Sequence, residues 1–130
     1  MSVGLWNPDG GKQSAQKLEE GELDSFLTLS LNGSLTVEDL KDAGVATRQS
    51  IMKLDPEAWE VAAGRSYADL DHLIRVFTLV EKLPGWDAGS KSPVIGPVKI
   101  LKARGQFEPE LRKWIKSNTD NRYLPYGSAL

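Results

Sequence analysis

The sequence predicts an all-α protein, in which six or seven short helices form a single compact orthogonal bundle. Helix starts and stops alternate along the chain, with Ser, Thr or Asp before an amphipathic segment and Gly after it. Residues 67–83 carry apolar side chains at helical spacing over a wide face. The segments are short and their connections are tight, which favours crossed rather than parallel packing. A length of 130 residues fits one domain with a buried core.

The two ends of the chain differ from its middle. Residues 1–12 are rich in glycine and proline, so we expect a flexible N-terminal tail there. Residues 13–130 then form the single helical domain. Asp120 and Asn121 are typical of a defined turn after the last helix, which favours an ordered C-terminal tail at 119–130.

Residues 22–37 fit two structures. The alternation in LTLSLNGSLTV around Asn32 and Gly33 is typical of a small β-hairpin at 27–37. The rival is a helix that ends at Leu31, with Asn32-Gly33 as a left-handed cap, and whose apolar face is Leu23, Phe26, Leu27 and Leu31. A two-residue hairpin loop would put the two apolar sets on opposite faces, and a lone hairpin is marginal. We therefore expect the helix, and the hairpin remains the alternative.

The later helices are marked by their caps. Thr36, with Asp39 three residues on, begins a helix that Gly44 closes, and ATRQSIMKL is a second short helix. The other expected helices run from Asp55-Pro56 to Gly64, from Ser66 to Leu83, from Ser92-Pro93 to Gly105, and from Glu108-Pro109 to Ser117. Pro97 should bend or delay the helix that starts at Ser92-Pro93. The inward positions of the long helix are Tyr67, Leu70, Leu73, Ile74, Phe77 and Val80, and those of the last are Leu111, Trp114 and Ile115.

Composition limits the functional classes. The chain has no cysteine, which excludes disulfides and cysteine-based zinc or redox sites. We find neither a secretory signal at the N-terminus nor an apolar run near the ~20 residues that a membrane helix needs. We therefore expect a soluble, cytoplasmic protein with no membrane partner.

Charge is divided unevenly along the chain. Residues 1–65 carry 6 basic and 11 acidic side chains, whereas residues 66–130 carry 10 basic and 7 acidic ones. Such asymmetry can indicate an anionic partner. We favour the interpretation that the two halves neutralise each other, within one molecule or between copies, so a homo-oligomer is one alternative.

No motif for catalysis stands out. His72 is the single histidine and has no second metal-type ligand at the usual spacing, so we expect a surface or core-edge residue. Ser50 and Lys53 match Ser-x-x-Lys without the companion motifs, and GWDAGSKS lacks the order of a phosphate loop. We therefore predict no catalytic residue, no cofactor and no metal, and favour a protein that is not an enzyme.

Residues 36–54 resemble a bacterial helix-turn-helix motif, with two short helices and a glycine at the turn. The resemblance implies DNA binding through the second helix, which would present Thr47, Arg48, Gln49 and Lys53 to bases and phosphates. Three acidic residues on the first helix, Glu38, Asp39 and Asp42, would repel the phosphates. An ordinary helical corner explains the same glycine, so nucleic acid is the alternative partner.

The remaining candidates are aromatic. The last stretch carries Arg122, Tyr123 and Tyr126, residue types that anchor protein interfaces. It either covers this protein's own helices or docks on a partner. Trp86 lies in a loop with Lys91 and either closes the core or forms an exposed contact. We predict a small non-enzymatic protein-binding module, an adaptor, regulator or inhibitor, that binds another protein through these five residues.

Overall fold

The computed structural model describes residues 18, 20–31, 35–119 and 121. Within these residues the chain is mostly helical and contains no strand, which confirms the all-α prediction. The elements are α2 (Glu20–Leu27), α3 (Val37–Asp42), η1 (Gln49–Lys53), η2 (Pro56–Gly64), α4 (Tyr67–Val80), η3 (Gly89–Lys91), α5 (Ile95–Arg104) and α6 (Pro109–Asn118), where η marks a 3₁₀ helix. The predicted N-terminal tail at 1–12, and the C-terminal tail apart from residues 119 and 121, lie outside the described residues.

Helix α2 ends four residues earlier than the sequence predicts. The backbone N–H groups of Thr28 and Leu29 donate to the carbonyls of Ser25 and Phe26, three residues back, and the Thr28 hydroxyl also donates to the Ser25 carbonyl at 2.6 Å. A threonine that bonds its local backbone in this way competes with the helical pattern. The prediction of a helix to Leu31 is therefore wrong. The turn of the alternative hairpin, residues 32–34, lies outside the described residues.

The capping predictions are confirmed at three helices. Thr36 and Asp39 form a reciprocal capping box at the start of α3, and Ser66 accepts from the Asp69 backbone N–H at the start of α4. Gly105 ends α5 in the left-handed conformation, with φ +70°. Residues 56–64 form a 3₁₀ helix, and the side chain of Asp55 makes no cap hydrogen bond there.

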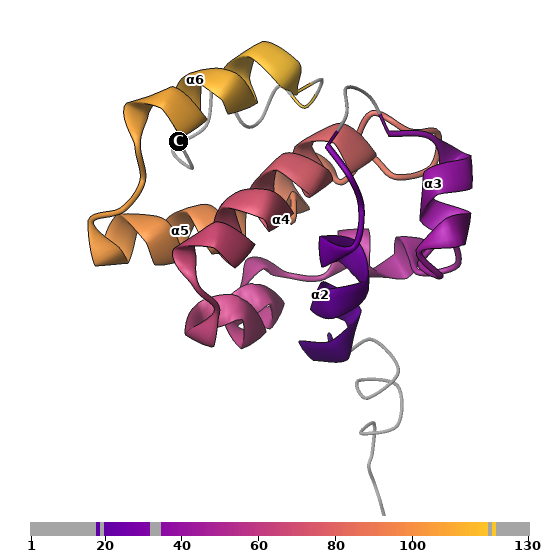
Figure 1. The fold of residues 1–130 in the computed structure, drawn as a ribbon, viewed down its shortest axis with the longest axis horizontal. Helices are drawn as coiled ribbons and strands as arrows, with labels where there is room; N and C mark the ends of the chain where they lie inside the picture. Colours follow the sequence, from indigo (N-terminus) through magenta and orange to yellow (C-terminus); the bar gives the residue numbers. More distant parts are fainter. Residues whose placement is uncertain (1–17, 19, 32–34, 120, 122–130) are drawn as a thin grey trace, which may run out of the picture.

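Helix α4 is the centre of the core, as predicted. Figure 1 shows it crossing the molecule between α2, α5 and α6, and these are the helices with which it packs most extensively. The ring of Phe77 lies 4.8 Å from that of Phe26 and 5.0 Å from that of Trp59, centroid to centroid. The prediction that Tyr67 faces inward is wrong. Its side chain is 38% exposed because α4 begins at the surface, where Ser66 and Ala68 are exposed too.

Two arginines connect the elements around α4. The Arg65 guanidinium lies 2.7 Å from Asp24 Oδ1 in α2 and 3.6 Å from Asp69 Oδ2 in α4. Arg104, the last residue of α5, donates to the carbonyls of Ala63 and Arg65 at 2.6 and 2.8 Å. These carbonyls lie where η2 ends and would otherwise lack helical partners. The two side chains therefore hold the end of η2 between α2, α4 and α5.

The last helix packs through fewer residues. Leu111 and Ile115 of α6 are buried, as predicted, whereas Trp114 is half-buried. The Arg75 guanidinium lies 4.9 Å from the centroid of the Trp114 ring and 3.0 Å from Asp71 Oδ2. None of the described helices is long and apolar enough to cross a membrane.

Candidate functional site

Trp86, the first of the predicted contact residues, lies in the core. It is 1% exposed, and its ring meets that of Phe26 edge-on at 6.5 Å between centroids. The interpretation of Trp86 as an exposed contact is therefore wrong, and the alternative, that it closes the core between two helices, is confirmed. Gly85, immediately before Trp86, lies in the turn after α4 with φ +83°, a conformation that glycine adopts without strain.

The other predicted contact residue that the structure describes is at the surface. Lys91 is exposed at the end of η3, and its Nζ lies 3.2 Å from Asp55 Oδ1. Nearby, Lys53 Nζ donates to the Asp87 carbonyl at 3.2 Å. Arg122, Tyr123 and Tyr126 lie outside the described residues.

The residues of the DNA-binding alternative lie on a different local structure from the predicted one. Gly44 makes the turn with φ +77°, but the second helix, η1, is a 3₁₀ helix of five residues that begins only at Gln49. Thr47 and Gln49 are exposed, whereas the Arg48 guanidinium forms an ion pair with Glu22 of α2. DNA binding therefore stays a prediction. Of the cations that would contact DNA, Arg48 already has an acidic partner within the protein.

A buried carboxylate accepts hydrogen bonds from the segment around Lys91. Glu81, which follows the last residue of α4, is 5% exposed, and it accepts hydrogen bonds from the hydroxyl of Ser92 and the backbone N–H of Ala88. Asn121 supplies a third donor, because its Nδ2 lies 2.7 Å from Glu81 Oε1 and 2.7 Å from the Gly89 carbonyl oxygen. We call Glu81, Ser92 and Asn121, with the backbone of 88–89, the clasp. It joins the end of α4, the loop before α5 and the chain after α6.

Burial and hydrogen bonding shift the pKa of the clasp's carboxyl in opposite directions. Desolvation raises the pKa of the Glu81 carboxyl above its ordinary value, and the nearby negative charge of Asp87 adds to the rise. The hydrogen bonds from Ser92, Asn121 and Ala88 oppose it, because they stabilise the charged form. A carboxyl with donors on both oxygens is well suited to hold three segments in place.

Sequence reasoning missed this cluster, although a signal was present. Glu81 lies four residues after Phe77, so the buried stripe of α4 extends onto it. A charged residue at a core position of an amphipathic helix requires hydrogen-bond partners. Nothing local indicates that those partners are Ser92 and Asn121, which are 11 and 40 residues away.

His72 lies at the edge of the core. His72 is half-buried, and its Nε2 lies 2.7 Å from the Leu29 carbonyl oxygen. This agrees with the expected core-edge residue, one that connects α4 to the segment after α2. Across the described part of the chain, no group of three or more carboxylates and histidines is close enough to hold a metal ion.

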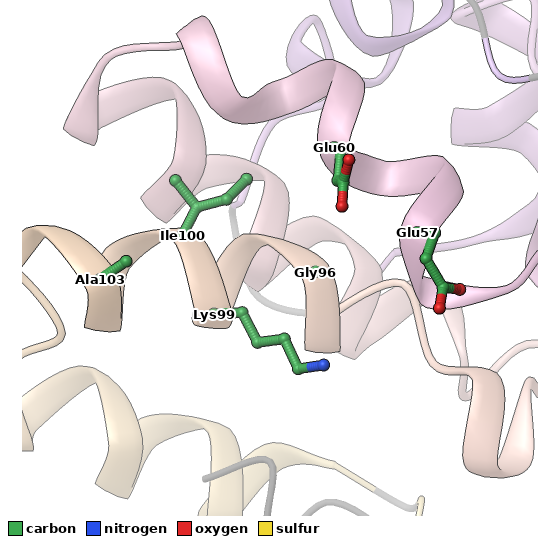
Figure 2. Close-up of a pocket in the computed structure, with 6 residues that line it drawn as sticks. All are labelled: Glu57, Glu60, Gly96, Lys99, Ile100 and Ala103. Carbon is green, nitrogen blue, oxygen red and sulfur yellow. The ribbon is translucent and has the colours of Figure 1, made fainter.

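A groove of about 230 Å³ lies between η2 and α5. Gly96, Ile100 and Ala103 of α5 line it, together with Lys99, and Glu57 and Glu60 line it from η2. Figure 2 shows the two carboxylates on the η2 side of the groove and Lys99 on α5, and Lys99 forms no ion pair with either carboxylate. The sequence prediction included none of these residues.

The comparisons with known proteins identify no relative. No protein-family model matches this sequence, and no curated protein or solved structure is significantly similar to it.

Proposed function

We propose that this protein is a small non-enzymatic binding module, an adaptor, regulator or inhibitor, which occupies the surface of another protein. Its contact surface comprises exposed Lys91 and the sequence Arg122–Tyr126 that follows the clasp. Trp86 is no longer part of that surface, because its ring is buried. Trp86 instead supports it, since the loop that carries Lys91 is fixed to the core through this side chain.

The hydrogen bonds of Asn121 carry the proposal. They fasten the chain to the Glu81 carboxylate and the Gly89 carbonyl immediately before Arg122 in the sequence. Interfaces gain affinity when the ordering of a segment is already accomplished before binding. An anchored start beside the loop that carries Lys91 therefore suits an arginine- and tyrosine-rich segment that binds a partner.

The proposal extends to the arrangement of the helices and to the location of the protein in the cell. A single orthogonal bundle, with its short helices and tight turns, would present this surface rigidly. We propose a cytoplasmic location on the basis of the cysteine-free composition.

A matched set of variants tests the function. The intact protein, immobilised, should capture a discrete protein from a lysate, and the purified pair should bind with a measurable Kd. Lys91→Ala combined with Arg122→Ala, Tyr123→Ala and Tyr126→Ala should weaken that Kd at least tenfold, because arginine and tyrosine are the usual hot spots. The control, Glu38→Ala with Lys41→Ala on the exposed face of α3, should bind as the intact protein does.

Two outcomes contradict the proposal. One is equal affinity of both variants, with both shown to be folded by circular dichroism. The other is binding to a DNA duplex at low salt that is lost in Arg48→Ala with Lys53→Ala, which would establish the nucleic-acid alternative instead.

A further inference from the structure

We propose that the groove between η2 and α5 binds a short segment of a partner protein in which an apolar side chain stands next to a lysine or arginine. The inference rests on the proposed protein-binding function, but none of the groove residues belongs to the Lys91 and Arg122–Tyr126 surface.

The floor of the groove is apolar and open. Gly96, Ile100 and Ala103 are spaced by four and three residues, which puts them on one face of α5. Glycine and alanine leave room where larger residues would fill the space between α5 and η2. Ile100 contributes an aliphatic wall that is only partly buried. An aliphatic side chain placed here would remove apolar surface from water, which is favourable.

The η2 side of the groove is acidic. Glu57 and Glu60 are three residues apart in a 3₁₀ helix, which has three residues per turn, so their side chains share one face. Both are exposed, and within the described ranges no basic group lies at ion-pair distance from either carboxylate. Lys99 also lines the groove (Figure 2), but it forms no ion pair with either glutamate and supplies one positive charge against two negative ones. Two carboxylates are thus available to a cation.

Size and charge together select the occupant. About 230 Å³ is below the ~300–1,000 Å³ of ordinary small-molecule sites, so the groove fits one or two side chains rather than a cofactor. Its charge repels polyanions and acidic segments and attracts basic ones. A segment with Leu, Ile or Met beside Lys or Arg would place its aliphatic side chain on the apolar floor and its cation beside the two carboxylates.

A random peptide library is the probe, because it contains acidic, neutral and basic segments alike. Twelve-residue peptides displayed on phage are selected against the full chain, and enriched sequences are synthesised. We expect an aliphatic residue next to Lys or Arg in the enriched peptides. Amide resonances of Gly96, Ile100 and Ala103 should shift on titration in a ¹H–¹⁵N correlation spectrum.

Two variants separate the floor from the carboxylates. Glu57→Gln with Glu60→Gln should weaken peptide binding about two- to thirtyfold in low salt, since exposed ion pairs are individually weak. This difference should vanish at 1 M salt, where the Debye length is ~3 Å. Ala103→Trp should abolish binding at any salt by filling the groove. The matched controls are Glu38→Gln with Glu110→Gln, and Ala68→Trp, all at exposed positions outside the groove.

The outcomes distinguish this inference from the proposed function. Enrichment of acidic peptides, absence of any enrichment, or undiminished binding to Ala103→Trp would overturn the groove proposal. Substitution of Lys91 and the three residues at 122, 123 and 126 should leave peptide binding intact. Loss of partner capture in that variant, with no peptide binding to the groove, would leave the proposed function standing and remove this inference alone.

Discussion

Replacing Asn121 by alanine should destabilise the protein by about 2 kcal/mol. The substitution removes one hydrogen bond to the Glu81 carboxylate and one to the Gly89 carbonyl, both of 2.7 Å. A bond to a charged group contributes roughly 1.5–3 kcal/mol and a neutral one roughly 0.5–1.5 kcal/mol. We take the low end because Asn121 is only half-buried. The midpoint of thermal unfolding should fall by roughly 6–10 °C in a chain of this size.

Urea unfolding followed by circular dichroism measures the effect, and Asn118→Ala is its control. Asn118 also donates through its side-chain amide, at 2.8 Å, but only to the Trp114 carbonyl within its own helix. Its removal should change the free energy of unfolding by about 0.5 kcal/mol or less, since alanine favours the helix. If Asn121→Ala were no more destabilised than Asn118→Ala, the clasp would not hold the chain after α6, and the reasoning would be refuted.

Three further changes test other parts of the structure. Glu81→Gln should become more stable relative to the natural protein as pH rises from ~4 to 7. The raised pKa of Glu81 gives the natural protein a stability that is complete below the ordinary carboxyl pKa and is lost as pH rises through the folded one. A difference in urea midpoint, variant minus natural protein, that stays constant or falls over this range would contradict it. Trp86→Ala should cost about 3–5 kcal/mol in chemical denaturation, as expected for a fully buried ring, whereas a cost below ~1 kcal/mol would mean that the ring is exposed. Gly85→Ala should cost about 1 kcal/mol because φ is +83°, and an unchanged urea midpoint would rule out this turn.

The sequence predicts the helix boundaries best where the signal is local. Ser66 and Thr36 cap their helices because a short polar side chain can bond the backbone three residues on. Gly105 ends α5 for an equally local reason, since glycine adopts a positive φ without strain. Errors begin where local patterns allow two outcomes. The apolar spacing that suggested a helix to Leu31 continues past Leu27, but the Thr28 side chain and backbone make a turn there instead.

The site could not be predicted to the same degree. Whether Trp86 is buried depends on Phe26, sixty residues earlier, and no local pattern specifies that contact. The clasp likewise joins Glu81 to a residue forty positions away. The groove depends on how far η2 and α5 stand apart, and small residues such as Gly96 and Ala103 indicate a close approach as readily as an opening. Tertiary packing decides all three.

The central claim is that two contacts hold the loop before α5 in place: the Trp86 ring packs in the core, and the Asn121 side chain bonds the loop backbone. Nuclear Overhauser contacts in solution test this claim most directly. The account predicts contacts from the Trp86 indole to the Phe26 ring, and from the Asn121 side-chain amide to Gly89, in one spectrum of the intact chain. A spectrum in which the Trp86 indole shows only solvent exchange, and Asn121 no contact with that loop, would contradict it.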